Sequence, residues 1–353
     1  MRKAHKRMGG TPKATKARVQ PLQLDAEWQR WIAENLLLGA DVNAVLAALT
    51  ERGCPADMAE AEVSAAVASP YLRGAAILQS RLQKRDWLLE SYGRLAAIDG
   101  ALPPVASRRA IQADDFFRDF YAMHRPVLLH GMIDHWPAMK LWSVEHVETL
   151  LGNPLVQVQT RRDADPDYET RSDQHRELVR LKAFTERLRS PDATNDVYLT
   201  ANNNDQNRAI FAPLWAEVGR IDGILREDAN EGGFLWMGPK GTVTPFHHDL
   251  TNNLLIQVRG RKKVWLVPSW ETPRMRNHKH CYSLHAGPAA IEALPPPQRP
   301  AMIECLIEPG DALFIPVGWW HHVEGLDATI GLSFTQFERD NDFYTRYSSY
   351  GAL

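Results

Sequence analysis

The segment from residue 242 to residue 268, TVTPFHHDLTNNLLIQVRGRKKVWLVP, places two histidines side by side with an aspartate directly after them. A second histidine pair follows in residues 310–326, GDALFIPVGWWHHVEGL. Successive side chains of a β-strand point to opposite faces, so each pair can send only one imidazole to a given place. If the first pair belongs to a strand, His247 and Asp249 share one face and His248 lies on the other.

A histidine and an aspartate two positions apart can bind a metal ion together with a histidine from a distant strand. This 2-His-1-carboxylate arrangement holds Fe(II) on one side and leaves other coordination positions open, whereas thiolate ligands favour zinc. The second pair supplies the distant histidine, as either His321 or His322, and strand alternation alone does not choose between them. An isolated histidine is usually a surface or hydrogen-bonded core residue, so the assignment depends on the surrounding sequence.

Short β-branched segments separated by turns dominate the chain after residue 104. They are RPVLLHGM, LVQVQT, DVYLT, GGFLWMG, NLLIQVRG, KKVWLVP, CLIEPGDALFIPV and ATIGLSFTQF. Strands at this density, with few long helices among them, predict an antiparallel sandwich or barrel.

Residues 23–100 follow a helical pattern instead. Apolar side chains recur there at helical spacing, beginning with Trp28, Ile32, Leu36, Val42, Val45, Leu46 and Leu49. Pro103 and Pro104 mark a linker to the β-rich part. We therefore predict a small helical module that packs or forms a homodimer surface at 23–100, and a catalytic domain at 101–345. Residues 1–22 carry seven Lys and Arg and no acid, which predicts a disordered basic tail.

The composition of the 353-residue chain is that of an ordinary globular protein, with 44% hydrophobic and 24% charged residues. The formal net charge of −2 provides no global field toward nucleic acid or anionic membrane, and no apolar run is long enough to span a bilayer. The three cysteines lie far apart, which disfavours a disulfide framework and a zinc finger. We expect a cytoplasmic protein that does not act on nucleic acid or membranes.

Both histidine segments, together with RPVLLHGMIDHWPAMKLW at residues 125–142, resemble the JmjC-type, cupin-like 2-oxoglutarate oxygenases, and most closely their hydroxylase branch. The resemblance runs from about residue 107 to about residue 340. It implies a mainly β fold, a double-stranded β-helix of the jelly-roll or cupin type, which follows the helical module in the chain. It also implies the iron ligands His247, Asp249 and His321, the first histidine of each pair.

The resemblance further implies a site for the cosubstrate 2-oxoglutarate. The far carboxylate of this molecule requires a buried cation and hydroxyl groups. In the family pattern the cation is Lys262, and the hydroxyl groups come from Thr244 and Tyr198. Asn253 corresponds to an asparagine near the cosubstrate. Ser333 stands where the family often has another asparagine, which removes one expected hydrogen bond.

The function that the resemblance implies is an Fe(II)- and 2-oxoglutarate-dependent dioxygenase, a hydroxylase of an amino-acid side chain in a protein or peptide. Residues 198–215, YLTANNNDQNRAIFAPLW, are expected to help form the mouth for this substrate. Two alternatives use the same chemistry. A lysine demethylase is disfavoured because no Cys/His zinc module accompanies the core. A tRNA-base hydroxylase is disfavoured by the near-zero net charge. A non-catalytic cupin-like binding protein is the alternative outside the enzymes. A zinc-dependent isomerase would require a site richer in His and Glu.

Overall fold

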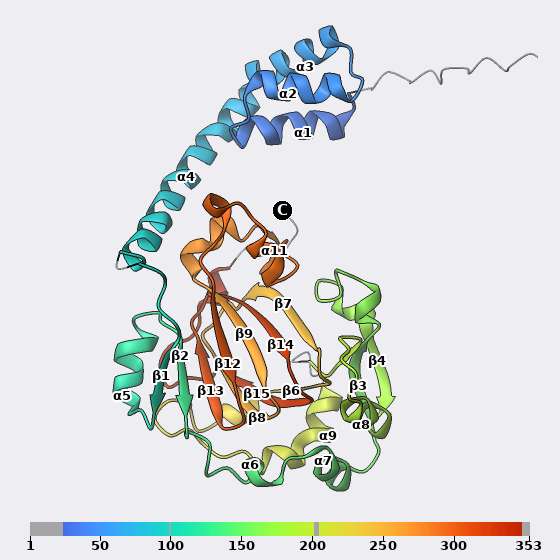
Figure 1. Cartoon of the computed structure of the whole chain (residues 1–353), viewed down its shortest axis with the longest axis vertical. Coiled ribbons are helices and arrows are strands. Elements are labelled where there is room, and N and C mark those ends of the chain that lie inside the picture. The colour runs from blue at the N-terminus through green and yellow to red at the C-terminus, as the bar shows by residue number, and fades with distance from the viewer. Residues whose placement is uncertain (1–23, 99, 201–204, 348–353) are drawn as a thin grey trace, which may run out of the picture. The chain divides into compact units, whose positions relative to one another are not determined.

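The computed structural model describes residues 24–98, 100–200 and 205–347 (Figure 1). The predicted basic tail at residues 1–22 lies outside this range. The chain divides into two compact units, Met1–Leu88 and Leu89–Leu353. None of the described helices is both long enough and apolar enough to cross a lipid bilayer.

The first unit consists of helices. They are α1 (Ala26–Leu37), α2 (Val42–Glu51), α3 (Ala56–Ala68) and the beginning of α4 (Pro70–Ala96). Asp25 caps α1, because its carboxylate accepts hydrogen bonds from the backbone N–H groups of Glu27 and Trp28. The first three helices enclose a small apolar core of Ile32, Val45, Leu49, Cys54, Ala59 and Val63. This core explains the helical spacing seen in the sequence.

Helix α4 differs from the other three, because none of its 27 residues is buried. Large apolar side chains lie exposed along it, namely Tyr71, Ile77, Leu78, Leu82, Trp87, Leu88, Tyr92 and Leu95. An apolar set of this size on one helix is unusual for a surface that faces only water.

The second unit is built on two six-stranded sheets, and the predicted mainly β, cupin-type fold is confirmed (Figure 1). The first sheet has the order β1 (Ala106–Arg109), β2 (Val127–His130), β13 (Asp311–Ile315), β8 (Asn253–Arg259), β15 (Thr329–Phe334) and β6 (Phe234–Gly238). The second has the order β10 (Asn277–Lys279), β11 (Tyr282–Ser283), β7 (Val243–His248), β14 (Trp320–Gly325), β9 (Lys262–Val267) and β12 (Ile303–Ile307). All neighbouring pairs are antiparallel except β1 and β2.

The two sheets pack face to face. One apolar cluster combines Leu255 and Leu313 of the first sheet with Val264 and Leu266 of the second. A third, smaller sheet contains β4 (Arg176–Arg180), β3 (Leu155–Thr160) and β5 (Val197–Tyr198), and a bridge between Leu199 and Met237 joins the end of β5 to β6.

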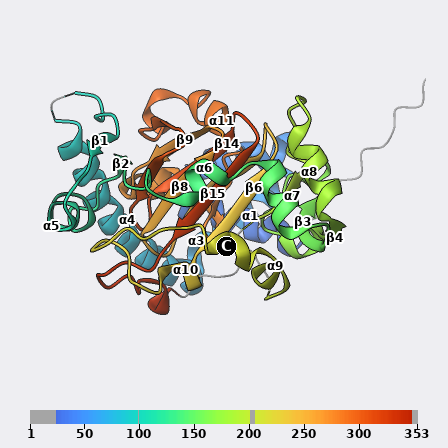
Figure 2. The same cartoon turned by 90° about the horizontal axis from the view of Figure 1, so that it is seen from below.

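Short helices cover the other face of the first sheet (Figure 2), whereas Ile291 of one further helix packs against Phe246, Trp265 and Trp320 of the second sheet. The α-helices are α5 (Ala113–Phe116), α6 (Pro137–Leu141), α7 (Val144–Leu151), α8 (Leu181–Arg189), α9 (Asp205–Trp215), α10 (Ala229–Gly232) and α11 (Pro288–Glu292). The remaining turns of helix are η1 (Phe117–Tyr121), η2 (Arg162–Ala164), η3 (Ser172–His175), η4 (Ser269–Arg274), η5 (Pro296–Gln298) and η6 (Tyr344–Arg346). Phe116, Val147 and Phe211 from these helices join Leu254 and Leu332 of the first sheet in the largest apolar core.

Candidate active site

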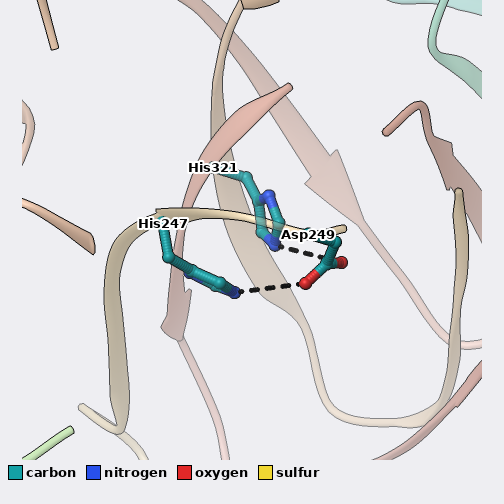
Figure 3. A group of neighbouring side chains, drawn as sticks. All are labelled: His247, Asp249 and His321. Carbon is teal, nitrogen blue, oxygen red and sulfur yellow. Dashed lines mark ion pairs between the residues drawn. The ribbon is translucent and has the colours of Figure 1, made fainter. Parts of the chain in front are cut away.

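Three side chains from two neighbouring strands meet between the sheets (Figure 3). His247 is the last but one residue of β7, Asp249 follows the end of the strand directly, and His321 lies opposite His247 on β14. Asp249 Oδ1 lies 3.8 Å from His247 Nε2, and Asp249 Oδ2 lies 3.8 Å from His321 Nε2. Two ligands of one ion, each bonded at roughly 2.0–2.2 Å, can be at most about 4.4 Å apart. The three side chains are therefore close enough to hold one metal ion.

The second histidine of each pair points elsewhere, as strand alternation requires. The His248 ring lies 4.7 Å from the Trp320 ring. The His322 ring lies 5.2 Å from Phe246 and 5.4 Å from Trp265, in an apolar layer. Neither ring belongs to the group formed by the first histidines.

Backbone carbonyls orient both imidazoles of the group. His247 Nδ1 lies 2.9 Å from the carbonyl oxygen of Pro245, and His321 Nδ1 lies 3.0 Å from that of Trp319. A carbonyl can only accept, so Nδ1 donates to the backbone in both rings, and Nε2 is the nitrogen that faces Asp249. Burial, followed by the neighbouring His321, lowers the pKa of His247 to about 4, which keeps this imidazole neutral at neutral pH.

Asn253 supports the carboxylate of the group. Its Nδ2 donates to Asp249 Oδ2 at 2.8 Å. Burial raises the pKa of Asp249, but His321, His247 and this hydrogen bond together hold it below its usual value. Asn253 Oδ1 is buried and has no hydrogen-bond partner among the described residues. The sequence placed Asn253 near the cosubstrate, and the structure adds that its amide nitrogen orients Asp249.

The group opens into a cavity of about 480 Å³. All five side chains named for the cosubstrate line the same cavity: Tyr198, Thr244, Asn253, Lys262 and Ser333. They come from β5, β7, β8, β9 and β15, so both large sheets and the small sheet contribute to its wall. Residues that lie up to 135 positions apart in the chain thus share one space.

Lys262 is the cation of this cavity. Only 3% of the residue is exposed, and it forms no ion pair with any described residue. Burial lowers its pKa to about 8. Gly331 gives the ammonium room, because a Cβ at that position would stand 3.2 Å from Nζ. A buried ammonium without a counter-ion is unfavourable, so this part of the cavity suits an anionic group.

Hydroxyl groups lie around the same cavity. Tyr198 and Thr244 form a hydrogen bond with each other, and burial raises the pKa of Tyr198, so its phenol stays protonated. Ser333 Oγ accepts a hydrogen bond from Trp236 Nε1 at 2.9 Å, which leaves its own proton for donation. These hydroxyl groups can bind carboxylate oxygens.

The side chains that line the cavity and were missed by the sequence analysis include Glu169, Trp236 and Tyr282. The Tyr282 ring stacks on His247 with 5.8 Å between centroids, but it belongs to a two-residue strand in the long connection between β9 and β12. Glu169 lies in an irregular polar loop, where no periodicity indicates which side chain turns inward. Of the segment expected at the substrate mouth, Tyr198 and Thr200 line the cavity, and residues 201–204 lie outside the described range.

Comparison with known proteins identifies the family. A family model described as a cupin-like domain matches residues 113–337, which is more than half of the chain. The protein belongs to the cupin-like domain family. The predicted JmjC-type relationship is confirmed by its relatives.

The cupin-like domain protein resembles several JmjC-type enzymes. It is 29% identical over 243 residues to Lysine-specific demethylase JMJ30 of Arabidopsis thaliana, covering 65% of this chain and 54% of the relative. It is 29% identical over 230 residues to Lysine-specific demethylase 8 of Xenopus tropicalis, covering 62% and 50%. Human tRNA wybutosine-synthesizing protein 5 is 22% identical over 264 residues, covering 70% and 82%. The matched region spans about half the length of the two demethylases.

JmjC-type proteins generally use Fe(II) and 2-oxoglutarate, and the residues of this cupin-like domain fit both groups. Two imidazoles and one carboxylate are the donor set that suits Fe(II). The unpaired ammonium of Lys262 is the complement of a carboxylate.

Proposed function

We propose that the protein is an Fe(II)- and 2-oxoglutarate-dependent dioxygenase that hydroxylates an amino-acid side chain of a protein or peptide. The observation that carries this proposal is the coincidence of two sites in one cavity. His247, Asp249 and His321 form the metal-binding group, and Lys262 is a buried cation without an ion-pair partner among the described residues.

In this proposal the residues of the chain bind and orient the reactants. His247, Asp249 and His321 would hold the ion, and Lys262 with the hydroxyl groups of Tyr198 and Thr244 would bind the far carboxylate of 2-oxoglutarate. When bound, Fe(II) and 2-oxoglutarate supply the oxygen activation that C–H oxidation requires. The aromatic rings of Trp236 and Tyr282 and the apolar face of the sheets exclude water from the reacting centre.

A protein substrate is favoured over RNA by the charges near the cavity. A groove of about 570 Å³ shares Thr251 and Thr335 with the cavity wall. Its lining includes three carboxylates, Glu338, Asp340 and Asp342, which would repel phosphate groups. Of the two arginines in this lining, Arg226 pairs with Asp228 and Arg339 packs over Phe117.

Glu169 adds a carboxylate to the cavity wall; one of its oxygens accepts from Arg162 Nη2, and the other can accept from a substrate side chain that donates N–H groups. The relatives include proteins named as lysine-specific demethylases and as Arginine-specific demethylase JMJ22 of Arabidopsis thaliana, which is 25% identical over 252 residues. Demethylation of a basic side chain is therefore the second candidate. It uses the same site, so the product distinguishes the two reactions.

The test is mass spectrometry of peptide libraries incubated with the protein, Fe(II), ascorbate and 2-oxoglutarate. Hydroxylation adds one oxygen atom to a peptide, whereas demethylation removes a methyl group as formaldehyde. The matched control is the Asp249→Ala variant under identical conditions. If wild-type protein forms no succinate and changes no peptide, the non-catalytic binding protein becomes the better interpretation.

We also propose a cytoplasmic location. The three cysteines, Cys54, Cys281 and Cys305, are free and buried, and free thiols suit a reducing compartment. Fractionation of cells that express the protein at its natural level tests the location.

A further inference from the structure

We propose that Arg162 is a positioning residue of the cosubstrate site, which fixes Tyr198 and Glu169 in the cavity wall from behind. Arg162 does not itself line the cavity, whereas both of its partners do. This inference rests on the proposed function, because it takes the cavity to be a 2-oxoglutarate site.

The chain turns sharply to bury this arginine. Arg162 begins η2, directly after Arg161, which has a φ of 57°. That left-handed conformation is unfavourable for a residue with a Cβ atom. It directs the following side chain inward, and the Arg162 side chain is fully buried. A buried guanidinium held behind an uncommon backbone turn indicates a specific role for its position.

The guanidinium connects the small sheet to the strand that carries a proposed metal ligand. Its Nη2 donates to Glu169 Oε1 at 2.9 Å and to the carbonyl oxygen of Val243 at 2.6 Å. Val243 is the first residue of β7, the strand that ends at His248. Arg162 thus fixes Glu169 relative to β7.

Two tyrosine rings complete the surroundings of the guanidinium. Its central carbon lies 4.3 Å from the Tyr168 ring and 5.0 Å from the Tyr198 ring, within cation–π distance. The Tyr168 hydroxyl donates to the same Val243 carbonyl at 3.2 Å. The contact with Tyr198 matters most for the cosubstrate, because it fixes the ring whose hydroxyl bonds Thr244 in the cavity wall.

The pattern of these contacts favours positioning over stabilisation. Arg162 Nε and Nη1 are buried without a hydrogen-bond partner among the described residues. A buried ion pair with unsatisfied donors is weak support for stability. Lysine cannot replace the arginine fully, because a single ammonium cannot contact Glu169, the Val243 carbonyl and two rings at once. The proposed metal ligands make no direct contact with the guanidinium in the structure.

The experiment measures binding and needs no turnover or substrate. Full-length protein is loaded with Mn(II) and titrated with 2-oxoglutarate by calorimetry, for wild type, Arg162→Lys, Arg162→Met, Tyr198→Phe and the double variant Arg162→Lys/Tyr198→Phe. We expect Arg162→Lys to raise the Kd for 2-oxoglutarate about tenfold, with the Kd for Mn(II) unchanged. In the Tyr198→Phe background the same substitution should change the Kd by less than about twofold, because the two residues act through one hydroxyl.

The matched control is Arg171→Met. Arg171 follows in the same region of the chain, but its guanidinium is 43% exposed and pairs with Asp165 and Asp167 away from the cavity. This variant should bind 2-oxoglutarate like wild type. Melting temperatures of all variants identify any that fail to fold, and if Arg162→Met does not fold, Arg162→Lys decides the question.

If Mn(II)-loaded wild type binds 2-oxoglutarate, three outcomes would overturn this inference and leave the proposed function standing. Wild-type affinity for 2-oxoglutarate in Arg162→Lys would show that the arginine does not act on this site. Fully additive effects of Arg162→Lys and Tyr198→Phe would show that it does not act through Tyr198. An equal loss of Mn(II) affinity would indicate general damage to the fold. If Mn(II)-loaded wild type itself binds no 2-oxoglutarate, the proposed function fails, and this inference fails with it.

Discussion

His247 and His248 are adjacent in the chain, yet their rings have different surroundings. The Nδ1 of His247 is bound by the Pro245 carbonyl, and its Nε2 faces Asp249. The His248 ring instead contacts Trp320 on the other face of the strand. The same division separates His321 from His322. The chemical role of each histidine is therefore set by the face of the strand on which it lies.

Alanine substitution of the paired histidines should divide them into two classes. His247→Ala, His321→Ala and Asp249→Ala should abolish binding of Mn(II) or Fe(II) and formation of succinate. His248→Ala should retain both, because its ring lies outside the group of ligands. Titration with the metal ion by calorimetry measures metal binding, and the melting temperature of each variant is the control for folding. Loss of the metal in His322→Ala, combined with its retention in His321→Ala, would contradict the assignment on β14.

Lys262 and Lys263 form a second adjacent pair with opposite surroundings. Lys263 is partly exposed and pairs with Glu304 at 2.8 Å, whereas Lys262 is buried in the cavity. Removing one partner of a buried charge pair costs roughly 3–5 kcal/mol, so Lys262→Ala should raise the 2-oxoglutarate requirement by about two to nearly four orders of magnitude. Lys263→Ala should change it little, because exposed pairs contribute less than about 1 kcal/mol.

Titration of 2-oxoglutarate against succinate release, with metal affinity measured in parallel, compares the two lysine variants. Metal affinity should stay at the wild-type value in both, because neither lysine contacts the group of ligands. A larger effect of Lys263→Ala than of Lys262→Ala would place the cosubstrate on the other face of β9.

Sequence patterns located part of this site for a physical reason. Alternation along β7 selects His247 over His248, since only His247 shares a face with Asp249. The same rule could not select His321 over His322, because no third ligand lies on β14, and the family pattern was needed. Glu169 and Arg162 could not be found, because their inward direction depends on a loop whose turns follow no period.

At the scale of elements, the strands were easier to predict than the short helices between them. Segments such as GGFLWMG and KKVWLVP became β6 and β9, because β-branched and aromatic runs suit a buried sheet. Helix α9 (Asp205–Trp215) falls in a segment expected only to shape the substrate mouth, and it contains Pro213. The sequence marks both ends of helix α7, because Ser143 caps its first turn and Gly152 ends it. The order of strands in each sheet depends on long-range pairing, which local patterns do not encode.

Helix α4 is the surface on which we expect the predicted homodimer to form. Leu78, Leu82, Leu88, Tyr92 and Leu95 are exposed on this helix and recur mostly at three- and four-residue spacing. A helix of 27 residues is about 40 Å long, which is enough for a substantial helix–helix contact. We expect the same face of a second copy to cover this apolar stripe and form a homodimer.

Charge introduced into the stripe should dissociate this dimer. The double variant Leu78→Lys/Leu82→Lys should elute as a monomer, whereas Met58→Lys, a matched change at an exposed apolar residue of α3, should leave the dimer intact. Size-exclusion chromatography with light scattering measures the mass. Deletion of residues 1–22 should not alter it. A wild-type protein that is monomeric at micromolar concentrations would refute the expectation.

At the scale of the whole molecule, the buried ammonium of Lys262 couples stability to pH. Its pKa is about 8 in the folded protein against 10.5 in the unfolded chain. Between these values the unfolded state binds more protons, so the free energy of unfolding rises with pH from about 8 to about 10.5. Below pH 8 the folded, cosubstrate-free protein is destabilised by about 3 kcal/mol.

Lys262→Met should therefore raise the melting temperature of the cosubstrate-free protein at neutral pH and remove this rise in stability above pH 8. The same variant should show no further stabilisation by 2-oxoglutarate, whereas Mn(II)-loaded wild type should gain stability as the ligand concentration increases. Thermal unfolding followed by fluorescence, with and without 2-oxoglutarate, measures both effects. A Lys262→Met protein that melts below wild type at neutral pH would show that the ammonium has a partner that compensates its burial.

The order of strands has a consequence for biosynthesis. β13 lies between β2 and β8, β14 between β7 and β9, and β15 between β8 and β6, so the last three strands of the jelly roll fill gaps between strands made earlier. While the ribosome is still synthesising residue 300, those earlier strands have unpaired edges, and His247 and Asp249 lack His321. The domain can close only when its final strands emerge, which makes folding a late event in translation. A chain interrupted shortly before β14 would contain most of the sequence and none of the assembled site, and its open strand edges would favour aggregation.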